Sequence, residues 1–314
     1  MCQLVLQQER MGRNHRLRSD PCPQSRYQGI LPAMAAPDYH DHIVDTLILE
    51  RAPKLAASPV WPMARPVLYG LLDYGKARRM ADAIAPLSGQ AALDHMSALL
   101  QVRVSVCGLE RVPKAGRLVV IANHPTGIAD GVAVYDALKA VRRDICFYAN
   151  ADAHRVSPGL GDMLIPVEWR EENRTRDRTR LTLSMTREAM EAERPLMIFP
   201  AGRLARQGRD GKLGESPWMS SAASLARKYE APIVPLHIKG PWSTLFHFFH
   251  HFSNELRDIT LFHELLNKRG GAFEIVVGQV IDPGALDGDA VEATQALQVY
   301  VEHVLPRYPD RAFA

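Results

Sequence analysis

The chain of 314 residues is 46% hydrophobic and 23% charged, which is the composition of an ordinary globular protein. This length allows a substantial buried core, in one large domain with an appendage or in two domains. The net charge of +3 suits anionic membrane or phosphate ligands, but it is too small to indicate a nucleic-acid partner.

The N-terminal segment carries no periodic pattern. Residues 1–37 are rich in Arg, Gln and Pro, so we expect them to be disordered. They lack the apolar centre of a signal peptide, and Met34 is an alternative start, so residues 1–33 are either native or an upstream extension. No apolar run has the length of a transmembrane helix, so we expect any membrane contact to be peripheral.

Residues 38–100 are expected to form an amphipathic helical cap, because apolar residues recur there at helical spacing. The first helix stops before Pro53, a second is predicted over residues 67–84, and a third over 91–100. Their apolar faces favour either packing on the protein's own core or a platform on a membrane surface. The interfacial residues of such a platform would be Trp61, Tyr69, Arg78 and Arg79.

A strand pattern then leads into a loop of chemically useful residues. Residues 102–106 alternate as a strand, and residues 118–122 are continuously apolar, which is typical of a strand covered on both faces. Turn-forming residues follow, and a helical pattern begins near Asp130. His124 therefore lies in a strand-to-helix loop, at the end of a strand where ligands gather.

His124 and Asp130 are candidates for a His/Asp dyad. A histidine acts as a general base when one ring nitrogen is free and the other donates to a partner that fixes the tautomer. A carboxylate six residues on, across a tight turn, can return to the imidazole. The alternative is that Asp130 only caps the helix and that His124 is an ordinary loop histidine.

The rest of the chain predicts an α/β domain over residues 101–314, closed by a helix over residues 291–305. Its further strands are predicted at residues 145–148, 164–167, 196–199, 232–238 and 273–280. Pro235 lies inside one of these strands, which places that strand at an edge or a bulge. After the strand ending at Phe199, Gly202 allows close backbone approach, and Arg203 and Arg206 present guanidinium groups suited to a phosphate.

Three stretches resemble motifs of the glycerolipid acyltransferase superfamily, lysophosphatidate type. Residues 123–131, Asn-His-Pro-Thr-Gly-Ile-Ala-Asp-Gly, resemble the first motif, although five residues separate the His from the Asp where the family has four. Residues 199–206 resemble the third motif, Phe-Pro-Glu-Gly-Thr-Arg-Ser-Arg, with Ala201 in place of its glutamate. Pro235 matches the fourth motif, Val-Pro-Val. In both respects, the longer spacing between His and Asp and the alanine at position 201, the sequence is more like the hemolysin-like, or lyso-ornithine-lipid, acyltransferase branch.

The resemblance implies a mixed, mostly parallel central sheet flanked by helices, as in glycerol-3-phosphate acyltransferases, after the helical cap. It implies that His124 and Asp130 are catalytic and that Arg203 and Arg206 bind the anionic head group of the acceptor. By position, Asn150 and Arg155 are further head-group candidates from the second motif. The residues implied as motif scaffold are Asn123, Gly127, Phe199, Pro200, Gly202 and Pro235.

The implied reaction moves a fatty acyl group from acyl carrier protein or coenzyme A to the hydroxyl of a lyso-lipid, either lysophosphatidate or lyso-ornithine lipid. We expect no metal or redox cofactor, and backbone N–H groups near Gly127 or Gly202 as oxyanion donors. We expect a bacterial protein in the cytoplasm, peripheral at the inner face of the cytoplasmic membrane. The alternative is a non-catalytic lipid-binding or membrane-associated module; a serine hydrolase would need a Gly-x-Ser-x-Gly elbow that the sequence lacks.

Two further segments leave alternatives open. Four arginines either form a solvated helix face or bind an anionic carrier protein or the phosphates of coenzyme A: Arg174, Arg176, Arg178 and Arg180. Residues 242–252 combine aromatic side chains with three histidines and indicate an acyl tunnel or a membrane-facing surface. No carboxylate or cysteine lies in that segment to complete a metal site, and the four cysteines of the chain are scattered.

Overall fold

The computed structural model describes residues 42–168, 175–207 and 213–313. The predicted disordered segment 1–37 lies outside this range, and so does Arg174 of the arginine-rich run. Among the described residues, no helix combines the length and the apolar character needed to cross a bilayer.

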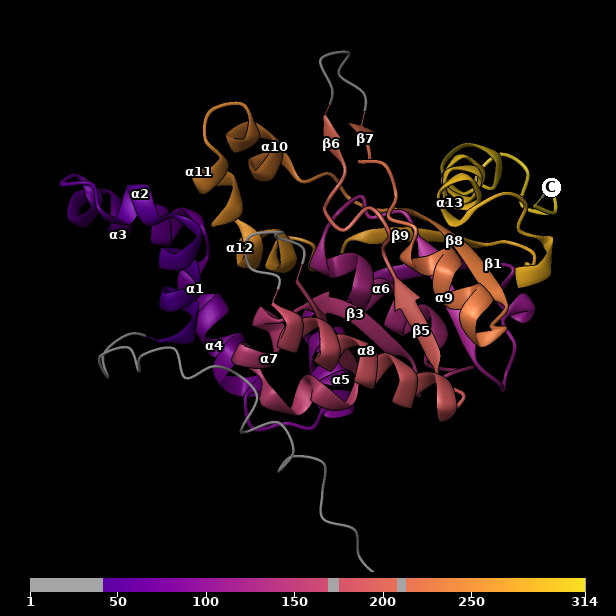
Figure 1. The fold of residues 1–314 in the computed structure, drawn as a ribbon. Coiled ribbons are helices and arrows are strands. Elements are labelled where there is room, and N and C mark those ends of the chain that lie inside the picture. The colour runs from indigo at the N-terminus through magenta and orange to yellow at the C-terminus, as the bar shows by residue number, and fades with distance from the viewer. Residues whose placement is uncertain (1–41, 169–174, 208–212, 314) are drawn as a thin grey trace, which may run out of the picture. The chain divides into compact units, whose positions relative to one another are not determined.

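A seven-stranded sheet forms the centre of the fold, in the order β1-β9-β8-β2-β5-β3-β4 (Figure 1). Its strands are β1 (Arg103–Cys107), β2 (Leu118–Ala122), β3 (Cys146–Asn150), β4 (Leu164–Val167), β5 (Pro195–Ile198), β8 (Ile233–Lys239) and β9 (Ala272–Val277). All neighbouring strands are parallel except β8 and β9, which pair antiparallel. The predicted mixed, mostly parallel sheet is therefore confirmed.

Strand β2 is the central strand that leads into the candidate site. All five of its residues are buried, because strands lie on both of its sides and helices cover both of its faces. Val120 lies opposite Met197 of β5 and Val234 of β8, and both pairings are parallel. The loops that leave the carboxyl ends of β2 and β5 therefore emerge at the same edge of the sheet.

The helices of the α/β domain lie on opposite faces of this sheet. The principal ones are α6 (Ile128–Leu138), α8 (Arg176–Glu191), α9 (Ser221–Tyr229) and α13 (Ala290–Val299). The connection through α6 runs from β2 toward β3, whereas those through α8 and α9 run in the reverse direction along the strand order. Right-handed crossovers then place α6 behind the sheet and α8 and α9 in front of it, as Figure 1 shows.

From residue 42 on, where the described chain begins, five helices precede the sheet: α1 (Ile43–Arg51), α2 (Pro53–Ala56), α3 (Trp61–Leu71), α4 (Tyr74–Ile84) and α5 (Gly89–Leu100). The prediction of one helix over residues 67–84 is wrong, because the chain breaks at Asp73, whose φ is +55°. The Asp73 carboxylate holds this break by pairing with Lys76 at 2.7 Å and His263 at 3.1 Å. Helix α3 instead begins earlier and includes Pro66.

Shorter elements complete the chain beside the site. They are α7 (Asp152–Val156), α10 (Thr244–His250), α11 (Asn254–Asp258), α12 (Leu261–Leu266) and the two short strands β6 (Arg206–Gln207) and β7 (Leu213–Gly214), which pair antiparallel. The predicted closing helix ends at Val299 and continues as a π-helical turn over Tyr300–Val304.

Strand β8 lies inside the sheet, between β2 and β9, and not at an edge as one alternative predicted. Its Pro235 carbonyl accepts a hydrogen bond from the N–H of Gly278 at 2.8 Å. Gly278 comes directly after the end of β9, and the antiparallel pairing resumes one residue out of register between Ile233 and Ile281, so the proline lies at an irregularity of the β8–β9 ladder. An interior strand tolerates the proline for this reason.

Candidate active site

His124 and Asp130 lie together at the carboxyl end of β2. The Nδ1 atom of His124 is 2.9 Å from Oδ2 of Asp130. Because the carboxylate accepts, Nδ1 carries the proton, and Nε2 is left with a lone pair. Nε2 makes no hydrogen bond within the described part of the chain, and the His124 side chain is 16% exposed. This arrangement can take a proton from a bound hydroxyl.

Asp130 both orients the imidazole and caps helix α6. Its carboxylate is fully buried, and Oδ2 also accepts from the N–H groups of Thr126 at 2.9 Å and Gly127 at 3.1 Å. Oδ1 accepts from the Thr126 hydroxyl at 2.5 Å. The capping role that the sequence offered as an alternative is therefore present in the same side chain.

The loop that carries His124 is fixed on both sides. The Asn123 side chain accepts from the N–H of Ile238 at 2.7 Å and donates to its carbonyl at 2.8 Å, as a neighbouring strand would. Gly127 has a φ of +94°, and a Cβ there would lie 3.0 Å from the side chain of Leu204. Glycine at this position permits both the backbone conformation and the close packing.

The loop after β5 contacts the dyad directly. The Phe199 ring stacks on the imidazole of His124, with centroids 4.2 Å apart and an angle of 24° between the planes. The N–H of Ala205 donates to the carbonyl of His124 at 3.0 Å. The first and third motifs, which lie far apart in the sequence, are thus brought together around one imidazole.

The two glycines predicted near an oxyanion site use their N–H groups within the protein. That of Gly127 donates to Asp130, and that of Gly202 donates to the carbonyl of Phe199 at 3.0 Å. Gly202 has a φ of +66°, which is the turn geometry that glycine favours. These two N–H groups are therefore engaged within the protein, and oxyanion binding by N–H groups near the two glycines stays a prediction.

Sequence reasoning missed Glu215, which follows β7. Its Oε1 accepts from the backbone N–H of His124, and its Oε2 accepts from the indole N–H of Trp218 at 2.7 Å. Burial raises the pKa of Glu215 to about 7, although both hydrogen bonds favour the charged form. The sequence held one indirect sign that another glutamate belongs to the site, because Ala201 leaves the third motif without its glutamate.

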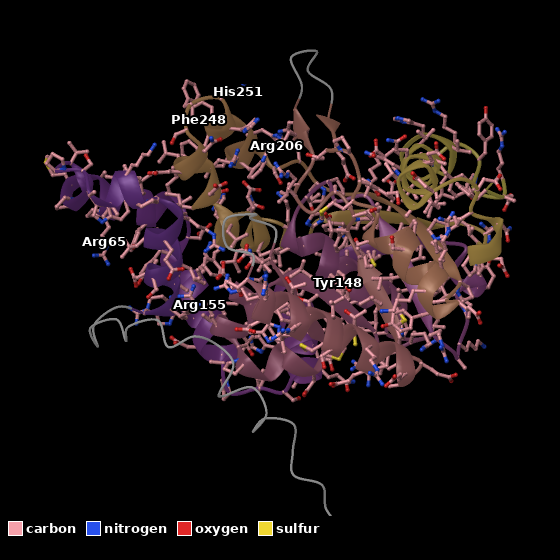
Figure 2. The ribbon with its side chains drawn as sticks, in the orientation of Figure 1. Arg65, Tyr148, Arg155, Arg206, Phe248 and His251 are labelled. Carbon is pink, nitrogen blue, oxygen red and sulfur yellow. The ribbon has the colours of Figure 1, made fainter. Side chains whose placement is uncertain are left out.

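Arg206 lies in a cationic cluster that extends to α11. Burial and the guanidinium groups of Arg257 and Arg203 lower the pKa of Arg206. Its Nε atom is buried without a partner in the described residues, whereas Arg257 is bonded to Asp258 at 2.7 Å. Figure 2 shows Arg206 on the same side of the molecule as His251 at the end of α10. This excess of positive charge suits an anionic group.

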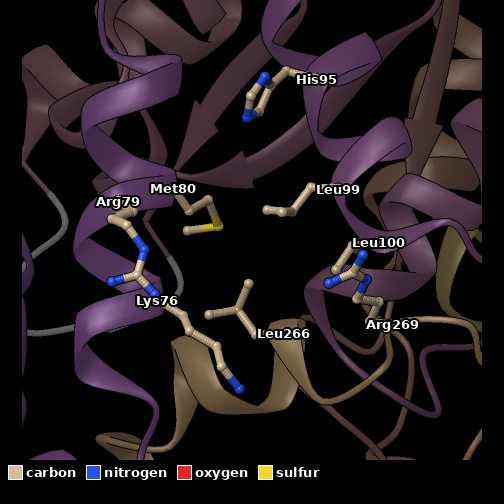
Figure 3. A pocket seen from close by; sticks show the side chains of 8 residues that line it. All are labelled: Lys76, Arg79, Met80, His95, Leu99, Leu100, Leu266 and Arg269. Atoms are coloured by element: carbon tan, nitrogen blue, oxygen red, sulfur yellow. The ribbon is translucent and has the colours of Figure 1, made fainter.

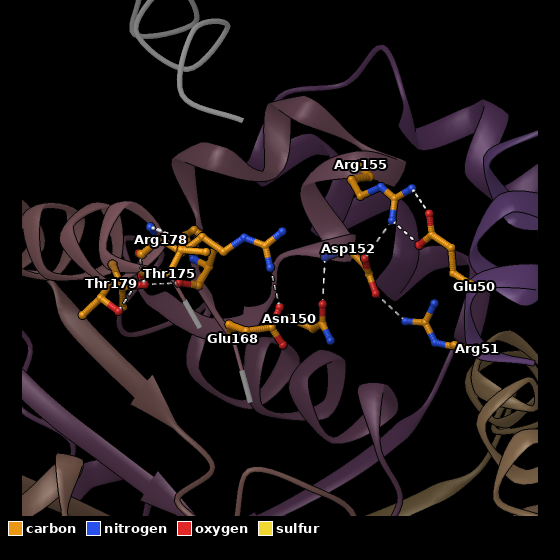
Figure 4. A network of polar contacts seen from close by, with 11 residues as sticks. Glu50, Arg51, Asn150, Asp152, Arg155, Glu168, Thr175, Arg178 and Thr179 are labelled. Carbon is orange, nitrogen blue, oxygen red and sulfur yellow. Dashed lines mark hydrogen bonds and ion pairs between the residues drawn. The ribbon is translucent and has the colours of Figure 1, made fainter. Parts of the chain in front are cut away.

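Asn150 and Arg155 lie elsewhere, in a network that joins α7 to α1 (Figure 4). The guanidinium of Arg155 bonds Glu50 at 2.6 and 2.8 Å and Asp152 at 3.2 Å, while Asn150 accepts from the Asp152 N–H at 2.9 Å. Figure 2 shows Arg155 well apart from Arg206. These contacts give Arg155 a role in holding the N-terminal helices, and head-group binding by this pair stays a prediction.

The arginines of α8 are partly paired within the chain. Arg178 bonds Glu168 at 2.8 Å, and Arg180 lies 3.6 Å from Asp177. Both pairs are consistent with a solvated, mixed-charge helix face. Binding of a carrier protein or coenzyme A by this face stays a prediction.

Two other features do not add to the site. A cavity of 540 Å³ lies among α4, α5 and α12, and no predicted site residue lines it (Figure 3). It is lined by Lys76, Arg79, Met80, His95, Leu99, Leu100, Leu266 and Arg269. Among the residues described here, no group of three or more metal-ligating side chains comes together.

The family model described as Acyltransferase matches residues 103–239, which include the dyad, Arg206 and Pro235. A lyso-glycine lipid O-acyltransferase of Phocaeicola vulgatus is 26% identical over 199 residues, covering 60% of this chain and 68% of that protein. Residues 103–239 are an acyltransferase domain. The chain is an O-acyltransferase, and the resemblance of its motifs to the acyltransferase superfamily is confirmed.

Two further similarities concern this acyltransferase. A lyso-glycine lipid O-acyltransferase of Bacteroides thetaiotaomicron is 25% identical over 155 residues, covering 49% of this chain and 55% of that protein. The crystal structure of the 1-acyl-sn-glycerophosphate (LPA) acyltransferase PlsC from Thermotoga maritima superposes with a TM-score of 0.44 and 16% identity. That comparison covers 70% of this chain and 81% of the PlsC chain.

Proposed function

We propose that this acyltransferase moves a fatty acyl group from a thioester of acyl carrier protein or coenzyme A to the hydroxyl of a lyso-amino-acid lipid, such as a lyso-glycine or lyso-ornithine lipid. The observation that carries the proposal is the 2.9 Å contact between His124 and Asp130, with Nε2 of His124 unpaired in the described chain. The names of the two curated relatives support a lyso-lipid with an amino-acid head group.

In the proposed reaction, Nε2 of His124 takes the proton of the acceptor hydroxyl as its oxygen attacks the thioester carbonyl. The tetrahedral intermediate then collapses, the C–S bond breaks, and the thiolate leaves with the proton returned from His124. Asp130 holds the imidazole in the required tautomer and stabilises the imidazolium that forms. The thioester carries a good leaving group, so the residues of the chain need not form a covalent intermediate.

The test is release of free thiol from acyl-carrier protein and from acyl-coenzyme A, each offered with lyso-glycine lipid, lyso-ornithine lipid and lysophosphatidate. Activity with one carrier and an amino-acid lipid supports the proposal. Activity with lysophosphatidate alone would overturn the acceptor class. Lipid binding without thiol release from either donor would favour the non-catalytic module.

Arg206→Ala is expected to raise the KM for the acceptor about 10-fold or more and to change kcat much less. A charge-assisted hydrogen bond contributes roughly 1.5–3 kcal/mol, and the head group is bound alike in the ground and transition states. Arg187→Ala is the control, because Arg187 is exposed on α8 and bonds only Glu191 at 2.7 Å among the described residues. An unchanged KM would remove Arg206 from the acceptor site.

We also propose that the enzyme works at a membrane surface, as its lipid substrates require. Four apolar side chains of the α3 region are exposed and recur along one helical face: Val60 (55%), Met63 (81%), Val67 (71%) and Leu71 (49%). On α10, Phe246 and Phe249 are buried while Phe248 points outward (Figure 2). Such faces suit insertion at the level of lipid head groups.

Met63→Asp is expected to lower the fraction of protein that floats with phospholipid vesicles about 10-fold. The substitution removes an apolar side chain worth roughly 1.5–3 kcal/mol of burial and adds a charge. Leu183→Asp is the matched control, since Leu183 is also exposed (53%) but lies on α8. Equal flotation of both variants and of the unmodified enzyme would exclude α3 as the contact surface.

A further inference from the structure

The backbone of His124 is held by the two ends of one hairpin. Ala205, directly before β6, donates to the His124 carbonyl at 3.0 Å. Glu215, directly after β7, accepts from the His124 N–H. Both polar main-chain groups of the base are therefore bonded to the segments that flank β6 and β7. Arg206, the candidate for acceptor binding, belongs to the same hairpin.

Glu215 is itself held in a fixed orientation. Its second oxygen accepts from the indole of Trp218, which is only 6% exposed. The N–H of Trp218 donates to the side chain of Gln298 at 3.1 Å, and the N–H of Met219 donates to the carbonyl of Pro200 at 3.0 Å. The first bond anchors the segment after β7 to α13, and the second anchors it to the third motif at Pro200.

We propose that Glu215 is a positioning residue for His124: its carboxylate fixes the main chain of the base and, as the anion, stabilises the imidazolium formed during acyl transfer. This role rests on the proposed function. The site then holds two carboxylates with different tasks, since Asp130 bonds the ring and Glu215 bonds the backbone.

The surroundings of Glu215 give this role a measurable signature. The titratable groups that act on it are His124, which favours its ionised form, and Glu302, which opposes it. Burial is the largest influence and raises the pKa of Glu215 to about 7. Stabilisation of the imidazolium is therefore lost as the pH falls below about 7, and kcat should decline with it.

The test compares Trp218→Phe with the double variant Glu215→Gln/Trp218→Phe. Glutamine in the native protein would turn an N–H against the indole N–H of Trp218, and phenylalanine removes that conflict. The glutamine oxygen still accepts from His124, so the pair differs mainly in charge. We expect the double variant to lose about 10-fold in kcat at pH 8, with KM for both substrates within about twofold.

The pH dependence of kcat separates positioning by charge from simple packing. The two variants share every other titratable group of the site, so the difference between their profiles reports Glu215. We expect the Trp218→Phe profile to contain an additional rise that the double variant lacks, and this rise should lie above pH 7 because loss of the indole bond raises the pKa of Glu215 further. Glu215→Asp in the same background keeps the charge and should recover the rise and part of kcat.

Equal kcat and equal profiles in the two variants would overturn the role of Glu215. An equal loss in the Gln and Asp variants, without a change in the profile, would also overturn it, because it would show that the residue only fills space. Absence of thiol release by the unmodified enzyme would instead contradict the proposed function. The two failures are therefore distinguishable.

Discussion

His124→Ala is expected to lower kcat by about 100-fold or more, because it removes the proposed general base. The substitution leaves the bonds between Asn123 and Ile238 intact, so the loop should keep its path. Initial rates of thiol release at saturating donor and acceptor measure the effect. A melting temperature close to that of the unmodified enzyme shows that the fold is retained.

His237→Gln is the matched control for this loss. His237 lies on β8, and its Nδ1 is 2.9 Å from the carbonyl of Val301. Its imidazole is thus engaged with the closing helical turn, and we expect kcat to change less than about twofold. Retained activity in His124→Ala, or an equal loss in both variants, would contradict the dyad.

Asp130→Asn is expected to reduce kcat on the order of 100-fold with little change in KM. Asparagine would place its amide oxygen at the Oδ2 position, where Nδ1–H of His124 and the N–H groups of Thr126 and Gly127 donate. Its –NH₂ would face the Thr126 hydroxyl, which can accept a hydrogen bond. The tautomer of His124 is then kept, but the negative charge that stabilises the imidazolium is lost.

Thr126→Val serves as the control for the Asp130 experiment. It removes only the hydroxyl bond to Oδ1 at 2.5 Å and leaves the bond between His124 and Asp130. We expect a stability loss of about 1 kcal/mol and a fall in kcat of less than about 10-fold. If Asp130→Asn behaved like Thr126→Val, Asp130 would be a helix cap alone.

Much of the fold follows from local pattern. The apolar run of β2 and its abrupt end at Asn123 predict a buried strand and a loop, and the six-residue step from His124 to Asp130 fits one turn. The break at Asp73 was not predictable in this way. It depends on a left-handed residue whose carboxylate is held by His263, 190 positions later.

The candidate site was predictable where it consists of neighbours in sequence. Glu215 contacts His124 across 91 positions, and no local spacing signals such a pair. Arg155 is a second example. Its position after a strand made it a candidate for head-group binding, but its guanidinium bonds Glu50 across 105 positions. Long-range pairing of charges depends on how the elements pack, which periodicity does not encode.

The two hydrogen bonds between the Asn123 side chain and the main chain of Ile238 restrict the motion of the active site. Surface loops usually open on their own, at a free-energy cost far below that of unfolding the whole domain. Here the residue next to His124 is joined to an interior strand, so moving this end of the loop requires breaking both hydrogen bonds to β8. The reactive nitrogen should therefore be preorganised before any lipid arrives, and substrate binding need not order it.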